Sequence, residues 1–224
     1  MADLDWNRDS FCSGLTTALT ATLREFNTAS LAVAVAGCAA AAEAVCEDRP
    51  MACSAGCPHC CVLNVAVLLP EALVIADWLQ GQLHPVALAA LRQRLAVHRN
   101  WGRWMDDEER IVRKAVCPLL NEVGSCSIHP VRPLACRSVS SLDRLSCEEA
   151  FDPIIGDQER GVPADLMRRA VYDAAFMALA SVLGCHGLDD RSIELGTGVL
   201  AFLESPACRD LLLSRKRLPR QLWE

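Results

Sequence analysis

Four cysteines fall within nine residues in the stretch Cys53-Ser54-Ala55-Gly56-Cys57-Pro58-His59-Cys60-Cys61. Thiolate ligands must lie about 2.3 Å from a shared zinc ion, and a short loop of closely spaced cysteines makes that possible. Gly56 and Pro58 suit a tight loop whose backbone amides can point at sulfur. Adjacent Cys60 and Cys61 cannot easily reach the same metal, so they serve two centres, or one is a spare or a bridge. The stretch predicts a loop-built metal site.

Four more cysteines follow in a part of the sequence without sustained periodicity: Cys117, Cys126, Cys136 and Cys147. Turn residues such as Gly124, Pro130 and Pro133 predict ordered loops there, with short turns of helix. We expect the metal ligands among these eight cysteines, with Cys147 the least secure. The other cysteines lie in helical patterns and are expected to be small buried apolar side chains: Cys12, Cys38, Cys46, Cys185 and Cys208.

The sequence around the cysteines favours helices. It is rich in alanine, aromatic residues make up only 5%, and strand formers are scarce. A helical pattern runs from about Leu15 to Cys46 and breaks at Arg49-Pro50, and a helix begins at Pro70. Leucines recur at helical spacing up to Pro85, which kinks or restarts the helix.

Further helices are expected later in the chain. A short one follows Asp106 and ends at Cys117-Pro118, and the last region predicts helices over 167–184, over 193–203 and after Pro206. No strand alternation is visible, so we predict an all-α, bundle-like domain around a loop-built cysteine site. The chain divides into an N-terminal helical segment (1–50), a cysteine-cluster region (51–150) and a C-terminal helical segment (151–224), packed into one domain.

Composition excludes some classes of protein. A net charge of −6 over 224 residues argues against a basic nucleic-acid binder. The N-terminus lacks the basic start and apolar run of an export signal. The uncharged stretch over 26–42 is too short and too polar for a membrane span of about 20 apolar residues. We therefore expect a cytoplasmic protein that binds no membrane, with reduced thiols; the oligomeric state stays open.

The order of the cysteines resembles a known family. The run Cys53-x3-Cys57-x2-Cys60-Cys61 is followed by Cys117-Pro118-Leu119 and then by Gly124-Ser125-Cys126-Ser127-Ile128-His129-Pro130-Val131-Arg132-Pro133-Leu134-Ala135-Cys136-Arg137. This pattern, over about residues 50–150, resembles the bacterial YkgJ-type cysteine-cluster family, which is described as zinc- or iron-chelating. Cys147 looks like the trailing cysteine of that family, and His129 stands where the family usually has Tyr.

The resemblance includes the domain of the flagellin lysine N-methylase, in which an iron–sulfur cluster is implied in methyl transfer. It favours an iron–sulfur cluster, of the 4Fe-4S type, in a protein that modifies an unidentified protein or small molecule by methyl or electron transfer. Zinc in a non-catalytic structural, carrier or sensor module is the alternative, because both centres use four thiolates. A dithiol oxidoreductase using Cys57 and Cys60 is weaker, since no βαβ pattern surrounds that pair.

Two arginines and two histidines flank the cysteines. Arg132 and Arg137 could balance the charge of an anionic cluster, and so bind the cofactor, or clamp a substrate carboxylate. They could also make only structural contacts within the loop. His59 and His129 could ligate or could donate hydrogen bonds to sulfur, but a surface or packing role is the simpler interpretation.

Overall fold

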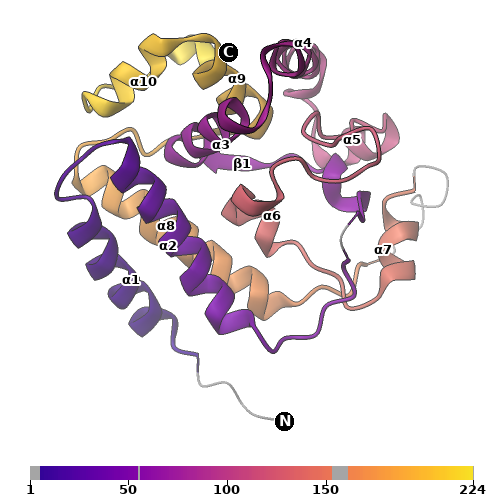
Figure 1. Ribbon diagram of the computed structural model, residues 1–224. Helices are drawn as coiled ribbons and strands as arrows, with labels where there is room; N and C mark the ends of the chain where they lie inside the picture. Colours follow the sequence, from indigo (N-terminus) through magenta and orange to yellow (C-terminus); the bar gives the residue numbers. More distant parts are fainter. Residues whose placement is uncertain (1–5, 55, 153–160, 224) are drawn as a thin grey trace.

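The computed structural model describes residues 6–54, 56–152 and 161–223, and within them the chain is built almost entirely of helices (Figure 1). One group packs α1 (Arg8–Thr22) and α2 (Thr28–Cys46) against α8 (Leu166–Cys185). A second group packs α3 (Leu69–Gln82) and α4 (Pro85–Gly102) against α9 (Leu195–Glu204), with α10 (Pro206–Leu213) beside α9. The all-α prediction is confirmed.

The helical pattern expected from about Leu15 to Cys46 is two helices rather than one. α1 ends at Thr22, and α2 starts at Thr28. Asn27 caps α2 by accepting a hydrogen bond from the Ser30 amide at 2.9 Å, and the Ser30 hydroxyl accepts one from the Asn27 amide at 3.0 Å. This reciprocal capping satisfies two otherwise unpaired amides and fixes the start of the second helix.

α2 is, within the described residues, the one helix whose length and composition would allow it to cross a membrane. In the structure it packs against α1, α3 and α8. The buried side of α2 consists of small and branched apolar residues: Leu31, Ala34, Cys38, Ala42 and Cys46. Small side chains on this face let α2 lie close to its neighbouring helices.

A short antiparallel pair of strands links the cysteine region to the second helix group. β1 (Ala66–Leu68) pairs with β2 (Ser192–Glu194), with Val67 opposite Ile193. The helix predicted for 193–203 therefore begins two residues later, at Leu195. Gly198 of α9 lies close to both β2 and α3. A Cβ at this position would lie 2.7 Å from Ile193 Cγ2 in β2 and 3.0 Å from Ala72 Cβ in α3.

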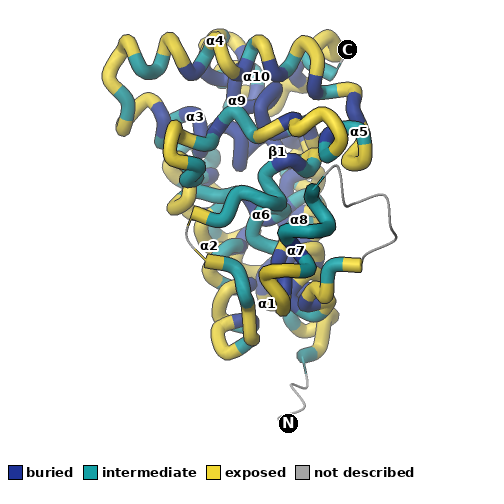
Figure 2. The backbone as a smooth tube through the Cα atoms, turned by 90° about the vertical axis from the view of Figure 1, so that its right-hand side faces the viewer, coloured by how far each residue is buried: buried dark blue, intermediate teal, exposed yellow. Residues whose placement is uncertain are grey.

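Short helical turns and the loops between them carry the clustered cysteines. These elements are η1 (His59–Val62), α5 (Asp107–Val112), η2 (His129–Val131), α6 (Leu134–Ser138) and α7 (Arg144–Ala150). α5 begins after Asp106 as predicted but ends at Val112, before Cys117-Pro118, and Lys114 follows with a positive φ of 51°. Figure 2 shows this part of the chain mostly half-buried, in contrast to the buried inner faces of α3 and α9.

Glu71 connects α3 to α6 from inside the core. It is 1% exposed. Its carboxylate accepts a hydrogen bond from the Leu68 amide at 2.9 Å, which caps α3, and one from the Leu134 amide at 2.8 Å. α6 also packs on α8. The helix that carries Cys136 is thus fixed to both helix groups.

Candidate metal centre

The loop before η1 is folded by local hydrogen bonds that suit closely spaced cysteines. The Cys57 amide donates to the Ser54 carbonyl at 3.2 Å, and the Cys61 amide donates to the Pro58 carbonyl at 2.9 Å. Gly56 has a φ of 82°, a conformation that residues with a Cβ rarely adopt. The resulting turns bring all four cysteines of the stretch onto one short, half-buried loop.

One side of this loop contacts the segment that contains Cys117 and Cys126. The Cys117 amide donates to the Cys61 carbonyl at 2.7 Å. Cys126 forms an antiparallel bridge with Leu120, so a tight hairpin brings it back toward Cys117. Burial raises the pKa of the Cys136 thiol on α6, and the charges of Cys117, Cys60 and Cys126 raise it further.

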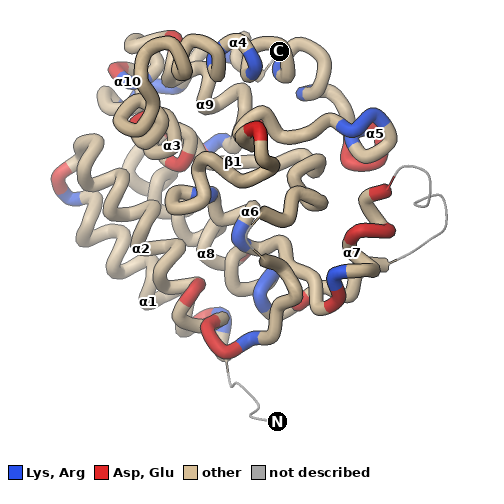
Figure 3. The backbone as a smooth tube through the Cα atoms, turned by 45° about the vertical axis from the view of Figure 1, so that its right-hand side comes forward, with Lys and Arg blue, Asp and Glu red and all other residues tan. Residues whose placement is uncertain are grey.

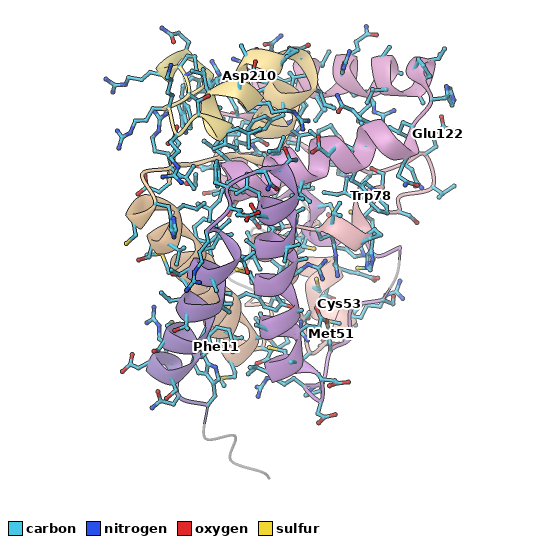
Figure 4. The ribbon with its side chains drawn as sticks, turned by 60° about the vertical axis from the view of Figure 1, so that its left-hand side comes forward. Phe11, Met51, Cys53, Trp78, Glu122 and Asp210 are labelled. Atoms are coloured by element: carbon cyan, nitrogen blue, oxygen red, sulfur yellow. The ribbon has the colours of Figure 1, made fainter. Side chains whose placement is uncertain are left out.

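The other side of the loop contacts the segment that leads into α7. The Ala52 amide donates to the Ser141 carbonyl at 2.8 Å, and the Ser141 amide donates to Cys53 Sγ at 3.3 Å. His59 Nε2 lies 3.3 Å from Glu148 Oε1, and α7 packs on η1. In Figure 4, Cys53 lies next to Met51 on the connection that follows α2. Cys147, which is buried on α7, therefore lies beside the cysteine stretch.

Burial shifts the pKa of four of the eight clustered thiols upward. It raises the pKa of Cys117 to about 12 and that of Cys147 to about 11, and it raises the pKa of Cys126 and Cys136 as well. Cys60 is the exception, because a hydrogen bond with the Cys61 thiol lowers its pKa to about 7. A thiophilic metal would have to displace protons from the thiols whose pKa is raised, which couples its binding to pH.

The two arginines predicted to bind the cofactor differ in their surroundings. Arg137 Nε donates to the Arg132 carbonyl at 2.8 Å, and Nη2 donates to the Pro130 carbonyl at 3.0 Å, so this guanidinium holds the loop together. Arg132 Nε is buried and has no hydrogen-bond partner within the described part of the chain. The pKa of Cys60 is lowered chiefly by its hydrogen bond with Cys61 and to a smaller extent by the positive charge of Arg132, and the same charge partly offsets the rise that burial causes in the pKa of Cys126. Arg132 is thus the arginine that faces the thiols.

Other sequence predictions have varied outcomes. Cys38, Cys46 and Cys208 are buried as expected, and Cys12 is half-buried. Cys185 is exposed at the end of α8, so the prediction that it is a buried apolar side chain was wrong. Nothing in the sequence pointed to Ser141 or Glu148 beside the cysteine loop, because a single Ser in a loop and a single Glu in a two-turn helix carry no periodic signal.

The donor chemistry fits a thiophilic metal. Eight thiols lie on one loop and the two segments that contact it, and the unpartnered Arg132 Nε supplies positive charge beside them. Among residues 6–54, 56–152 and 161–223, no three Cys, His, Asp or Glu side chains are already arranged to hold a metal ion. The assignment of individual ligands, and of any role for His59 or His129, stays a prediction.

Comparison with known proteins agrees with the cysteine pattern. Residues 52–153 match the sequence model of the CxxCxxCC family, whose description is "Putative zinc- or iron-chelating domain". This part of the chain is therefore similar to a CxxCxxCC domain. The match confirms the resemblance to YkgJ-type proteins and supports metal binding by the domain. No curated protein and no solved structure matches the chain.

Proposed function

We propose that the CxxCxxCC-like region of this protein holds an iron–sulfur cluster of the 4Fe-4S type. The observation that carries the proposal is that Cys117, Cys126 and Cys136 lie singly on separate elements, a loop, a bridged hairpin and a helix. Zinc sites are commonly built from paired knuckles. Single ligands from separate elements suit a centre larger than one ion.

Arg132 supports the same proposal. A cluster bound by four thiolates carries net negative charge, and a buried guanidinium with a free Nε would stabilise it and raise its reduction potential. When bound, such a cluster supplies electron transfer, or an iron site open to a ligand. We assign the protein a role in modifying a protein or small molecule by methyl or electron transfer. This role follows from the resemblance to the flagellin lysine N-methylase domain.

The second candidate is a non-catalytic zinc module. Three hollows on the structure have volumes of about 460, 670 and 310 Å³, and none of the three is lined by a clustered cysteine. A substrate-binding cavity at the thiols would favour an enzyme, whereas closed four-thiolate coordination would favour a module. We place either form in a reducing cytoplasm, with no membrane or nucleic acid as partner; all 13 cysteines are free thiols in the structure.

The deciding experiment is anaerobic purification followed by measurement of iron, acid-labile sulfide and zinc. We expect brown protein that contains iron and sulfide and bleaches in air. The Cys136→Ser variant should lose iron, whereas Cys185→Ser, at the exposed end of α8, should keep it. Colourless protein with stoichiometric zinc and no sulfide would overturn the cluster and favour the zinc module.

A further inference from the structure

One face of α4 and of the turn that follows it exposes large apolar side chains, although α4 already packs another face on α9. On the exposed face, Val97 is 55% exposed, Trp101 42% and Trp104 66%. These residues follow one another at steps of four and three, which places them on one side of a helix. The face that packs inward is a different set: Leu91, Leu95, His98 and Gly102. Two exposed indoles on one side of a helix form an apolar surface of the kind that marks an interaction site.

Both indole rings are held in place by neighbouring side chains. The Trp101 ring packs edge-on against the ring of buried His98, with ring centroids 5.8 Å apart. The Arg103 guanidinium lies over the Trp104 ring, with Cζ 4.5 Å from the ring centroid. Rings that are already ordered lose little rotamer freedom on binding, so they can serve as anchors for a partner.

The charge of α4 is opposite in sign to that of the whole protein. The chain has a net charge of −6, but residues 85–105 contain no Asp or Glu and four arginines: Arg92, Arg94, Arg99 and Arg103. Figure 3 shows basic residues along α4. Within the described part of the chain, the guanidinium groups of Arg94 and Arg99 form no ion pair or hydrogen bond. Their charges are therefore available to the carboxylates of a partner.

We propose that this face docks an acidic segment of another protein. The tryptophan face consists of Arg94, Val97, Trp101 and Trp104, since Arg94 is exposed and lies three residues before Val97. Carboxylates of the segment pair with the arginines, and its apolar side chains pack on Val97 and the indoles. Trp and Arg are the residue types that contribute most to binding energy at protein interfaces. The inference goes beyond the proposed metal binding and does not depend on it.

The charges that follow the tryptophan face favour a short acidic segment over an anionic membrane or a nucleic acid. Exposed Asp106, Asp107 and Glu108 come directly after Met105, at the start of α5. A broad anionic surface laid on α4 would come close to these carboxylates and be repelled by them, whereas a short segment can be confined to α4. The helix has 18 residues, or about 27 Å of length, along which such a segment can lie.

The tryptophan face is joined to the cysteine region through α5. This helix begins three residues after Trp104 and packs on η1, which carries Cys60 and Cys61. The Asn64 amide donates to Asp107 Oδ1 at 2.7 Å, which fixes α5 to the segment that follows η1. A protein docked on α4 is therefore held beside the element that packs on the cysteine stretch.

The experiment is a titration of a fluorescein-labelled peptide with the full-length protein, followed by fluorescence anisotropy. The peptide is an amphipathic sequence with leucines at helical spacing and glutamates elsewhere. Wild type should bind it saturably, and added salt should weaken the binding. A peptide with glutamine in place of glutamate should bind at least about tenfold more weakly. Trp101→Ala and Trp104→Ala should each weaken binding of the acidic peptide at least about tenfold.

Two further variants complete the set. Arg94→Gln should weaken binding and reduce its salt dependence. Met177→Ala, which removes a side chain that is 57% exposed on α8, is the matched control and should bind as wild type does. A benzophenone placed in the acidic peptide should cross-link wild type within residues 94–104, a measurement that needs no substitution in the protein.

Each contrary result overturns the proposal. These results are an absence of saturable binding by wild type, equal binding of the glutamine peptide, unchanged binding by both tryptophan variants, and cross-links confined to other parts of the chain. Binding to phosphatidylserine vesicles but not to the peptide would assign the face to a membrane. Dimerisation in the ultracentrifuge that is lost in Trp104→Ala would assign it to a second copy of this chain. None of these measurements depends on metal content, so their failure leaves the proposed metal binding intact.

Discussion

Replacing Glu71 should destabilise the fold and loosen the metal site together. Glu71→Ala leaves the amides of Leu68 and Leu134 without their acceptor, and these residues are 0% and 1% exposed. A buried unsatisfied donor costs about 1–3 kcal/mol, so two cost about 2–6 kcal/mol. We expect urea unfolding, followed by circular dichroism, to show a loss in this range below pH 5. Bound metal should fall as well, because the Leu134 amide anchors the helix that carries Cys136.

The pH dependence gives a sharper test. Burial raises the pKa of Glu71 from 4.5 to about 7, so the folded protein holds this proton more tightly than the unfolded chain. Protonated Glu71 therefore stabilises the fold fully below about pH 4.5, and this stabilisation is lost as the pH rises to about 7. At about 1.36 kcal/mol per pKa unit, the loss is about 3 kcal/mol. Glu71→Gln stays neutral and should lack this dependence.

The comparison of wild type with Glu71→Gln cancels the proton dependence of the cysteines. The free energy of unfolding of wild type should fall relative to the variant between pH 4.5 and 7. Exposed Glu122→Gln is the matched control and should parallel wild type. A difference between wild type and Glu71→Gln that does not change with pH would refute the reasoning.

Three further predictions concern packing, an ion pair and thiol reactivity. Gly198→Ala places a methyl group 2.7 Å from Ile193 Cγ2. The overpacking should destabilise the fold by about 1–3 kcal/mol, which exceeds the gain of about 1 kcal/mol in helix propensity. Thermal unfolding should therefore show a lower Tm. Asp165→Ala removes the N-cap of α8 and the carboxylate that pairs with Arg49 Nη2 at 2.7 Å. Urea unfolding should show that the free energy of unfolding falls by at least about 1 kcal/mol. Because Arg49 lowers the pKa of Asp165, the stabilisation by this ion pair is present above about pH 4 and is lost as the pH falls further. In metal-stripped protein at pH 7, iodoacetamide should modify Cys60 before Cys61, since the Cys60 pKa is about 7 and the thiolate is the nucleophile; peptide mapping that finds the reverse order would contradict this.

Local chemistry explains which parts of the fold could be predicted from the sequence. Pro70 and Pro85 lie in the first turns of α3 and α4, and Asp106 caps α5 by accepting from the Glu109 amide at 2.8 Å. These signals act within one turn of helix, so they need no knowledge of tertiary contacts. The cysteine spacing similarly predicted the domain, because closely spaced thiols have few other uses in one loop.

The features that were missed depend on longer-range contacts or on short elements. β1 and β2 have three residues each, too few for visible alternation, and each pairs with a strand more than 100 residues away in sequence. Asn27 and Ser30 form a capping box that was present in the sequence, but the apolar periodicity of the alanine-rich segment concealed it. In the sequence Glu71 is an ordinary first-turn glutamate, and its hydrogen bond with the Leu134 amide, 63 residues away, becomes visible only in the structure.

The placement of the cysteines explains why metal and fold should depend on one another. The two helix groups bury most of the leucine side chains, whereas the clustered cysteines lie outside them on loops and short helices, all half-buried except the buried Cys147. This region is joined to the core by the buried side chains of Leu119, Ile128 and Leu134 and by the hydrogen bond of Glu71 to α6. The Ser141 carbonyl, which accepts from the Ala52 amide, joins the segment before α7 to the start of the cysteine stretch. Thiolate–metal bonds would add cross-links between segments as far apart as Cys53 and Cys147, so the free energy of metal binding would also stabilise this part of the fold.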